Sequence, residues 1–193
     1  MNIQSIEQEI DRLETYQKKG ETYTNDKGSY GWRNPIRKDT GRILQSLILA
    51  ANPKRILEIG TAHGLSALYL MRGAGKDCHL DTIEFEQLVA QQAQKLMNEL
   101  ELNVQVHCGE AMEVIHGLSD PYDVVFFDAQ KSHYAKQLDL ILAKKLLQKD
   151  GIIIADNVLD RIEECRDFYK KLEKENMDYT VIHTECGLLV AKF

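Results

Sequence analysis

Hydrophobic residues along this chain form two alternating patterns, short apolar runs and longer stretches with apolar positions three or four residues apart. The runs predict buried strands and the longer stretches predict amphipathic helices. Strands separated by helices are typical of parallel βαβ units, so the order predicts a doubly wound α/β sheet. The expected strands span residues 56–59, 79–83, 104–107, 122–127, 152–155, 179–183 and 188–193. The last two are too close for a crossover, so we expect them to pair antiparallel at one edge.

The helical stretches lie between these runs. We expect helices at residues 3–19, 40–48, 65–72, 86–100, 111–118, 134–147 and 161–176. Asp39 or Thr40 is the expected N-cap of the second helix, whose apolar positions extend to Ile48 and which is expected to end at Asn52-Pro53. An Asp150-Gly151 turn is expected to lead into the fifth strand.

The N-terminal part of the chain does not follow the alternation of strands and helices. The helix at 3–19 is amphipathic and is expected to pack on the domain or on a second copy of it. The polar segment that follows carries Tyr23, Tyr30 and Trp32, and predicts either a surface loop held down by its aromatic residues or a lid over the substrate. We therefore divide the chain into a cap or dimer contact at 1–38 and a main domain at 39–193.

Composition narrows the class of protein. With 193 residues and 44% hydrophobic content, the chain is sufficient for one domain with a sizeable core. It contains no apolar run near the roughly 20 residues that span a bilayer, and its start lacks the features of a signal peptide, so we expect a soluble cytoplasmic protein. Four widely spaced cysteines predict reduced thiols. A net charge of −6 argues against a broad grip on a nucleic-acid backbone, while a local basic patch remains possible.

Residues 58–66 read Glu-Ile-Gly-Thr-Ala-His-Gly-Leu-Ser, the end of a strand, a glycine turn and the start of a helix. A dinucleotide fingerprint requires Gly-x-Gly-x-x-Gly, but the second and third positions counted from Gly60 are Ala62 and Leu65. A P-loop is excluded because no Gly-Lys-Ser/Thr follows. The pattern Glu-x-Gly-x-x-x-Gly suits a ligand with a carboxylate and an adenosine but no phosphates. The alternative is ordinary turn chemistry between a strand and a helix.

Ligands of open α/β sheets bind beyond the carboxyl ends of the strands, so polar residues at those ends are the candidates for binding. Glu84 ends the second strand of the main sheet, where a carboxylate takes both hydroxyls of a ribose; the alternative is a solvated or helix-capping side chain. Gly109 and Ala111 follow the third strand, and their small size lets an adenine lie against the backbone.

Asp128 follows the fourth strand, and Asp156 and Asn157 follow the fifth. Two carboxylates and an amide oxygen from adjacent strand ends are a donor set that suits Mg²⁺. The alternative is that each is a turn residue after a strand. Lys131 lies three residues after Asp128, and a lysine beside a divalent cation has its charged form disfavoured, which allows it to act as a base. A solvated loop lysine is the alternative.

Together these segments resemble the metal-dependent class I S-adenosylmethionine O-methyltransferases, the group of the catechol and caffeoyl-coenzyme A enzymes, as a small bacterial member. The resemblance rests on residues 58–66, 82–84, 109–111, 128–134, 155–158 and 187–189. It implies a Rossmann-like, mostly parallel seven-stranded sheet with an antiparallel last strand, and commonly a homodimer.

The resemblance also implies roles for individual residues. Residues implied to bind S-adenosylmethionine are Glu58, Gly60, Ala62, Gly64, Ser66, Glu84, Gly109, Ala111 and Asp128. Asp128, Asp156 and Asn157 are implied to bind Mg²⁺ or another hard cation such as Mn²⁺ or Ca²⁺, and Lys131 is implied to take the proton from the acceptor.

The expected function is methyl transfer to a hydroxyl of a catechol-like or hydroxylated aromatic small molecule. One alternative keeps the chemistry on a 5-hydroxyuridine at the wobble position of tRNA, with phosphate contacts from Arg33, Arg37, Lys38 and Arg42. A second alternative is a non-catalytic protein that binds S-adenosylmethionine. The retained Asp128 and Lys131 argue against that second alternative.

Overall fold

The computed structural model describes residues 2–19, 23–25, 28–30 and 35–193. The strands are β1 (Tyr23–Asn25), β2 (Gly28–Tyr30), β3 (Arg55–Ile59), β4 (His79–Glu84), β5 (Val104–Cys108), β6 (Tyr122–Phe127), β7 (Leu147–Ala155), β8 (Asp178–Ile182) and β9 (Leu188–Lys192). The helices are α1 (Ile3–Lys19), α2 (Lys38–Ala51), α3 (Leu65–Ala74), α4 (Gln87–Glu99), α5 (Ala111–Gly117), α6 (Tyr134–Ala143) and α7 (Ile162–Lys174), with a short 3₁₀ turn, η1 (Lys131–His133), before α6.

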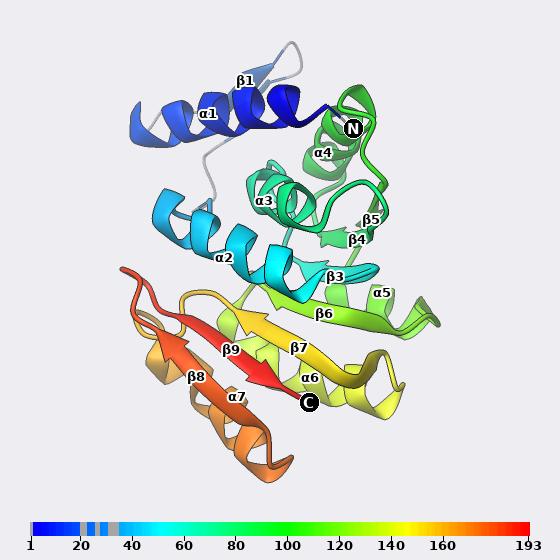
Figure 1. The fold of residues 1–193 in the computed structure, drawn as a ribbon, viewed down its shortest axis with the longest axis vertical. Coiled ribbons are helices and arrows are strands. Elements are labelled where there is room, and N and C mark those ends of the chain that lie inside the picture. The colour runs from blue at the N-terminus through cyan, green and yellow to red at the C-terminus, as the bar shows by residue number, and fades with distance from the viewer. Residues whose placement is uncertain (1, 20–22, 26–27, 31–34) are drawn as a thin grey trace.

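The main sheet has seven strands in the order β5-β4-β3-β6-β7-β9-β8 (Figure 1). The pairs β3 with β4, β3 with β6, β4 with β5 and β6 with β7 are parallel. The last strand, β9, runs antiparallel to both of its neighbours, β7 and β8. The predicted doubly wound sheet with an antiparallel last strand is confirmed. Strand order reverses between β3 and β6, so this is where the carboxyl ends of the strands open a crevice for a ligand.

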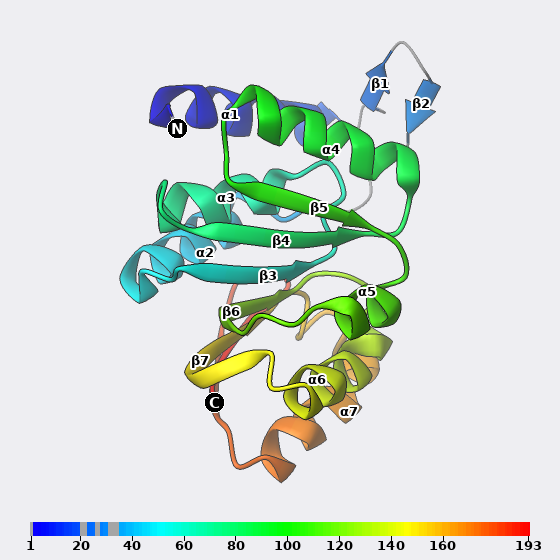
Figure 2. The same cartoon turned by 90° about the vertical axis from the view of Figure 1, so that its right-hand side faces the viewer.

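Alternating side chains of the strands face two hydrophobic cores, one on each face of the sheet. Ile56, Val124 and Ile154 pack with helices α2 and α3 on one face, and Leu57 and Val125 pack with α6 and α7 on the other. Figure 2 shows α5, α6 and α7 together on one side and α2 and α3 on the opposite side. A central strand buried on both faces is apolar along its length, which explains the continuous runs in the sequence.

The N-terminal helix is fixed to the main domain by buried and half-buried charges. Glu7 accepts hydrogen bonds from Arg42 of α2, at 3.1 Å, and from Arg72 of α3, at 2.9 Å. The buried carboxylate of Glu14 accepts a hydrogen bond from the Tyr69 hydroxyl of α3. The expectation that this helix packs on the domain is therefore confirmed, and it explains the helical spacing of its apolar residues.

Three local predictions were wrong. The helix expected at 134–147 ends at Ala143, and β7 begins at Leu147. The register between β6 and β7 shifts after Leu147, and Asp150 has a φ of +65°, so the expected turn is an irregularity within a longer strand. Helix α2 is preceded by Arg37 in an extended conformation without a side-chain cap, so neither predicted N-cap is one.

The segment after α1 contains a short antiparallel pair, β1 with β2, that the sequence did not predict. Trp32 lies outside the described residues, and the side chains of Tyr23 and Tyr30 are not described either. The lid over the substrate stays a prediction. The division of the chain into 1–38 and 39–193 also stays a prediction.

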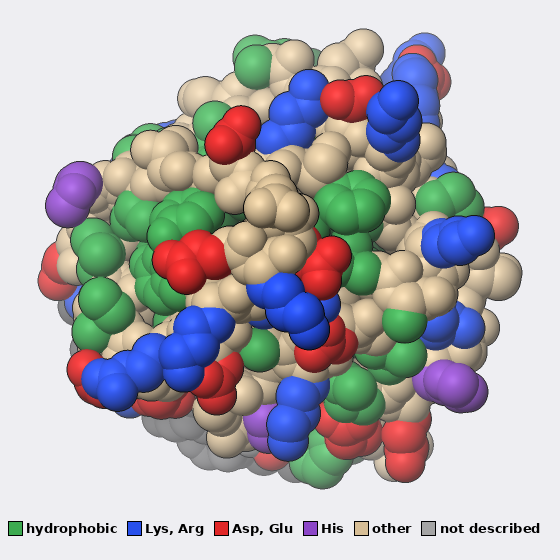
Figure 3. Space-filling view, turned by 90° about the horizontal axis from the view of Figure 1, so that it is seen from below, with side chains coloured by type: hydrophobic (Ala, Val, Ile, Leu, Met, Phe, Trp, Pro, Cys, Tyr) green, Lys and Arg blue, Asp and Glu red, His purple; other side chains and the backbone are tan. Residues whose placement is uncertain are grey.

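The described residues provide no membrane-spanning helix and, on the face seen from below in Figure 3, no basic track for a nucleic acid. In the described part of the chain, no helix is long and apolar enough to cross a membrane. Figure 3 shows basic and acidic side chains interspersed on the face seen from below, without a broad area of one sign. On α7, basic side chains form ion pairs with acidic side chains three residues away, as Lys170 does with Asp167 at 3.0 Å. This face offers no continuous track for a phosphate backbone.

Candidate active site

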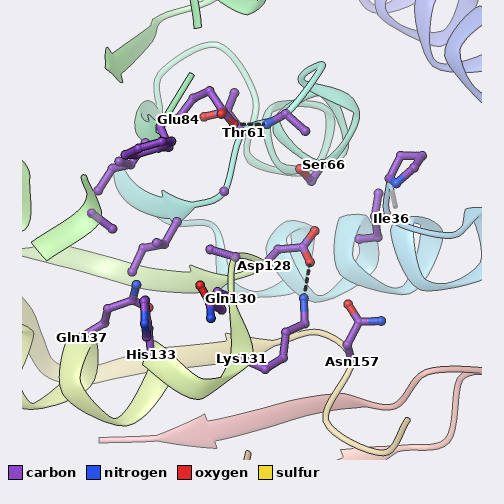
Figure 4. Close-up of a pocket in the computed structure, with 18 of the residues that line it drawn as sticks. Ile36, Thr61, Ser66, Glu84, Asp128, Gln130, Lys131, His133, Gln137 and Asn157 are labelled. Atoms are coloured by element: carbon purple, nitrogen blue, oxygen red, sulfur yellow. Dashed lines mark hydrogen bonds and ion pairs between the residues drawn. The ribbon is translucent and has the colours of Figure 1, made fainter. Parts of the chain in front are cut away.

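One pocket of about 650 Å³ opens at the carboxyl ends of β3, β4, β5, β6 and β7. Its walls come from the loops that follow these strands, from the residues just before α2, and from the beginnings of α3, α6 and α7. The predicted site residues that line it are Gly60, Ala62, Ser66, Glu84, Gly109, Ala111, Asp128, Lys131 and Asn157. Figure 4 shows Glu84 on one side of this pocket and Lys131 and Asn157 on the opposite side.

The turn after β3 requires glycine at its first position. Gly60 has a φ of +108°, a region that side chains disfavour, and its N–H donates to the carbonyl of Ile83 at 3.0 Å. The next N–H, that of Thr61, donates to the same carbonyl at 3.1 Å. These bonds hold the turn against the end of β4 and leave its concave side open to the pocket.

Glu84 is fixed in place by backbone N–H groups. One carboxylate oxygen accepts from Ala62 at 2.9 Å, and the other accepts from Glu86 at 2.9 Å. Each oxygen has further lone pairs, so the carboxylate can also accept two hydroxyl groups from the pocket side. Such a pre-oriented carboxylate at the end of the second parallel strand fits the two hydroxyls of a ribose.

The loop after β5 supplies a flat, small-residue wall. Gly109 has a φ of +154° and is followed by Glu110, whose carboxylate caps α5 by accepting from the N–H of Met112 at 2.7 Å. Ala111 is the first residue of α5 and faces the pocket. The side chain of Phe85 is 71% exposed at the mouth of the same pocket, where a ring can cover a bound base.

The end of β6 places a carboxylate beside an ammonium group. Lys131 Nζ lies 3.4 Å from Asp128 Oδ1, with side-chain exposures of 14% and 10%. Tyr134, at the start of α6, donates its hydroxyl to the carbonyl of Phe127 at 3.0 Å and packs against the rings of Phe127 and Phe168. This anchor fixes α6 to the sheet, and it determines where the preceding turn carries Lys131.

Burial raises the pKa of Asp128 well above its ordinary value, the nearby charge of Asp156 raises it further, and Lys131 opposes both. Burial likewise raises the pKa of Asp156 to about 6. Two carboxyl groups are therefore enclosed together with one ammonium group. Anionic carboxylates in such a place are stabilised by an additional cation.

The end of β7 contributes Asn157, which has a φ of +63° and lines the pocket. Its side-chain amide lies 3.5 Å from Asp160 Oδ2, and its backbone N–H donates to Asp156 Oδ1 at 2.8 Å. Asparagine tolerates this left-handed conformation better than most residues, and it lets the chain turn directly after β7.

Three predicted residues do not line the pocket: Glu58, Gly64 and Asp156. Glu58 is fully buried under the turn, where it accepts from Thr82 at 2.6 Å, and burial raises its pKa to about 7 despite hydrogen bonds from Ser66 and Thr82. Gly64, with a φ of +85°, begins α3. Within the described ranges, no three His, Cys, Asp or Glu side chains are grouped as a metal site. Ligand roles for these three residues stay predictions.

Other lining residues were missed from the sequence. They are Pro35, Ile36, Ile59, Thr61, His63, Leu65, Ile83, Phe85, Glu110, Ala129, Gln130, His133, Gln137, Asp160, Arg161 and Glu164. Most carry no individual signal because they neighbour the motifs. Gln137 is different: it is a polar residue between Tyr134 and Leu138 on the buried face of α6, and that break in the apolar pattern was visible in the sequence.

The fold and this pocket define a Rossmann-like α/β protein with its ligand site at the carboxyl edge of the sheet. The family model described as O-methyltransferase matches residues 14–174, so the chain belongs to that family. This confirms the resemblance found in the motifs.

Individual relatives agree with that membership. Catechol O-methyltransferase from Niastella koreensis is 32% identical over 130 residues, which cover 64% of this chain and 58% of the relative. Catechol O-methyltransferase from Mycobacterium tuberculosis is 30% identical over 130 residues, which cover 66% of this chain and 58% of the relative. The chain thus spans less than two thirds of these relatives. An O-methyltransferase from Bacillus cereus in complex with SAH shares the fold, with a TM-score of 0.78, 24% identity and coverage of 97% and 90% of the two chains.

Proposed function

We propose that this protein transfers a methyl group from S-adenosylmethionine to a hydroxyl of a small aromatic acceptor, with a divalent cation bound. The observation that carries the proposal is that one pocket contains the glycine turn, the pre-oriented Glu84 and the pair Asp128 and Lys131. The relatives named catechol O-methyltransferase support an acceptor with two vicinal hydroxyls.

The residues that line the pocket suggest where each part of S-adenosylmethionine would bind. The turn at Gly60 and the start of α3 at Ser66 would hold the methionine portion, and Glu84 would accept both ribose hydroxyls. Gly109 and Ala111 would border the adenine. The methyl group bound to the sulfonium is the electrophile that S-adenosylmethionine supplies.

The residues present also fit a hard cation. Asp128 and Asn157 offer oxygen atoms on the pocket wall, and Asp156 is close enough to raise the pKa of Asp128. Asp128, Asp156 and Asn157 would hold the ion; Mg²⁺ is the expected one, and Mn²⁺ or Ca²⁺ has the same preference for oxygen. When bound, the cation supplies a Lewis acid that lowers the pKa of an acceptor hydroxyl.

Lys131, as its neutral amine, would accept the proton of that hydroxyl and become the ammonium ion. Its amino group is mostly enclosed, at the junction between the wall that would hold the cofactor and the side of the pocket lined by Asn157. Asp128 orients it through their contact, and the enclosure limits competition from water.

Calorimetric titration tests the cofactor first. We expect heat on addition of S-adenosylmethionine or S-adenosylhomocysteine and none on addition of NAD. Methyl transfer is then measured with a vicinal diphenol and with the matching monophenol, and we expect the diphenol to be preferred because only it offers two adjacent oxygens. NAD binding, or equal rates with both phenols, contradicts the proposal.

The tRNA alternative has little support among the described basic residues. Arg37 pairs with Glu185 at 3.0 Å, Lys38 with Glu14 at 2.5 Å and Arg42 with Glu7 at 3.1 Å, while Arg33 lies outside the described residues. Binding of bulk tRNA that weakens with salt would favour this alternative. A homodimer also stays a prediction, and sedimentation measures it.

A further inference from the structure

Gln137 carries a buried amide oxygen without a partner. The residue is 1% exposed, it lines the pocket, and its Oε1 atom is enclosed with no hydrogen-bond partner in the described structure. An unsatisfied buried acceptor destabilises a fold, and nearly all such groups in proteins are satisfied. Rotation of the side-chain amide by 180° exchanges its oxygen with its NH₂ group, so the oxygen can turn toward the pocket and accept a hydrogen bond from a ligand there.

Gln137 lies at the end of the pocket where the proposed function places the adenosine. Figure 4 shows it beside His133 and on the same side of the view as Glu84, while Ile36 and Asn157 lie toward the other side. Its helix, α6, packs on α5, the helix that begins at the pocket residue Ala111. Gln137 is thus placed for contact with the base and away from the acceptor.

We infer that Gln137 recognises the nucleobase of the cofactor, with its amide turned so that Oε1 accepts a hydrogen bond from the exocyclic amine of adenine. This inference rests on the proposed function. The side-chain amide of glutamine matches adenine because it accepts from the amine while its NH₂ group can donate to a ring nitrogen, the same pairing that proteins use to read adenine in DNA.

Neighbouring carboxylates are less suited to this task. Glu110 uses one oxygen to cap α5, accepting from Met112 and Glu113. Glu84 has both oxygens on backbone N–H groups and faces the expected ribose. Gln137 adds an acceptor that no described group uses, which makes recognition of the amine its specific contribution.

The test is a double-mutant cycle by calorimetry. S-adenosylhomocysteine is compared with the analogue whose purine lacks the 6-amino group, on the unmodified protein and on Gln137→Met, a change that keeps an unbranched side chain of similar length. The unmodified protein is expected to bind the amino-free analogue roughly 10-fold more weakly, because its acceptor is left unpaired. Gln137→Met is expected to bind both ligands within roughly 2-fold of each other.

Gln91→Met, at an exposed position of α4, is the matched control and should keep the full preference for the amine. Urea unfolding without ligand separates recognition from a structural role: Gln137→Met should be at least as stable as the unmodified protein, because no internal hydrogen bond is lost. The inference is overturned if the unmodified protein binds both ligands equally, or if Gln137→Met keeps the preference. A lack of any S-adenosylhomocysteine binding would instead refute the proposed function.

Discussion

The backbone at Gly60 passes so close to Asp128 that a Cβ atom at residue 60 would lie 2.6 Å from the Asp128 carbonyl oxygen. The glycine turn after β3 and the end of β6 are therefore in contact. The part of the proposed site that would hold the cofactor thus packs directly against the part that contains Asp128. No side chain fits between them, so glycine is needed at residue 60 for packing as well as for its φ of +108°.

Gly60→Ala should therefore disrupt both stability and binding. We expect roughly 3 kcal/mol less unfolding free energy, from the strain at positive φ and the contact with backbone, and weaker binding of S-adenosylhomocysteine. Gly75→Ala is the control, because Gly75 has a φ of +84° but a Cβ there would meet nothing within 4 Å. It should lose only the roughly 1–3 kcal/mol that backbone strain costs, and less than Gly60→Ala. Equal losses in urea titrations of the two variants would contradict the contact.

Lys131→Met should separate binding from catalysis. If Lys131 accepts the proton, kcat falls roughly 100-fold or more, while the dissociation constant of S-adenosylhomocysteine changes little. Lys136→Met, at an exposed position of α6, should retain full activity. Initial rates and calorimetry on the same preparations provide both quantities. Unchanged kcat in Lys131→Met would remove this residue from the mechanism.

Asp81 should contribute to stability in a pH-dependent way. Burial would raise its pKa, but hydrogen bonds from His107 and Tyr122, together with His79, outweigh it and lower the pKa to about 2. A lowered folded-state pKa stabilises the fold above the ordinary value of 3.8, and this contribution disappears as the pH falls toward 2. It amounts to about 2 kcal/mol at neutral pH.

Urea unfolding of Asp81→Asn across pH 7 to 3 measures that contribution. The stability gap to the unmodified protein should be constant from pH 7 to about 5 and shrink below about 4. The exposed Asp178→Asn is the control and should show no such gap. A gap independent of pH down to 3 would mean that the effect arises from packing instead of charge.

Tyr69→Phe tests how α1 is held on the domain. The Tyr69 hydroxyl donates to the buried Glu14 carboxylate, and hydrogen bonds to charged groups contribute about 1.5–3 kcal/mol. We expect a loss of that size in urea unfolding. The control is Tyr169→Phe, whose hydroxyl makes only a long contact of 3.4 Å to Val158 and should change stability by less than about 1 kcal/mol. Losses of the same size would show that Tyr69 does not anchor α1.

Much of the fold was predictable because strand and helix periods differ sharply in this chain. The runs at β3 and β6 are mostly apolar since both faces of the sheet are covered, and helix α1 was predicted with its observed bounds. The secondary-structure prediction was wrong where a helical spacing of apolar residues continues into a segment that pairs as a strand. Leu146 and Leu147 continue a helical spacing, yet Leu147 pairs with Tyr122 and begins a strand.

The site was predictable only in part for a related reason. Strand ends identified Glu84, Asp128 and Asn157, because the sheet brings its carboxyl ends together. The sequence could not show that Glu58 would be enclosed beneath the turn, since burial depends on tertiary packing. It also could not reveal that Gln137 reaches the pocket from the next helix, because that depends on how α6 packs against α5.

Metal-dependent methyl transfer at this pocket can be measured directly. The most direct measurement follows labelled methyl from S-adenosylmethionine to a vicinal diphenol, first with Mg²⁺, then after a strong chelator, then with Mg²⁺ restored, for the unmodified protein and Asp128→Ala. We predict transfer that is abolished by the chelator, recovered with the ion, and absent in the variant throughout. Transfer that continues at the same rate in the chelator, or in Asp128→Ala, would contradict the claim.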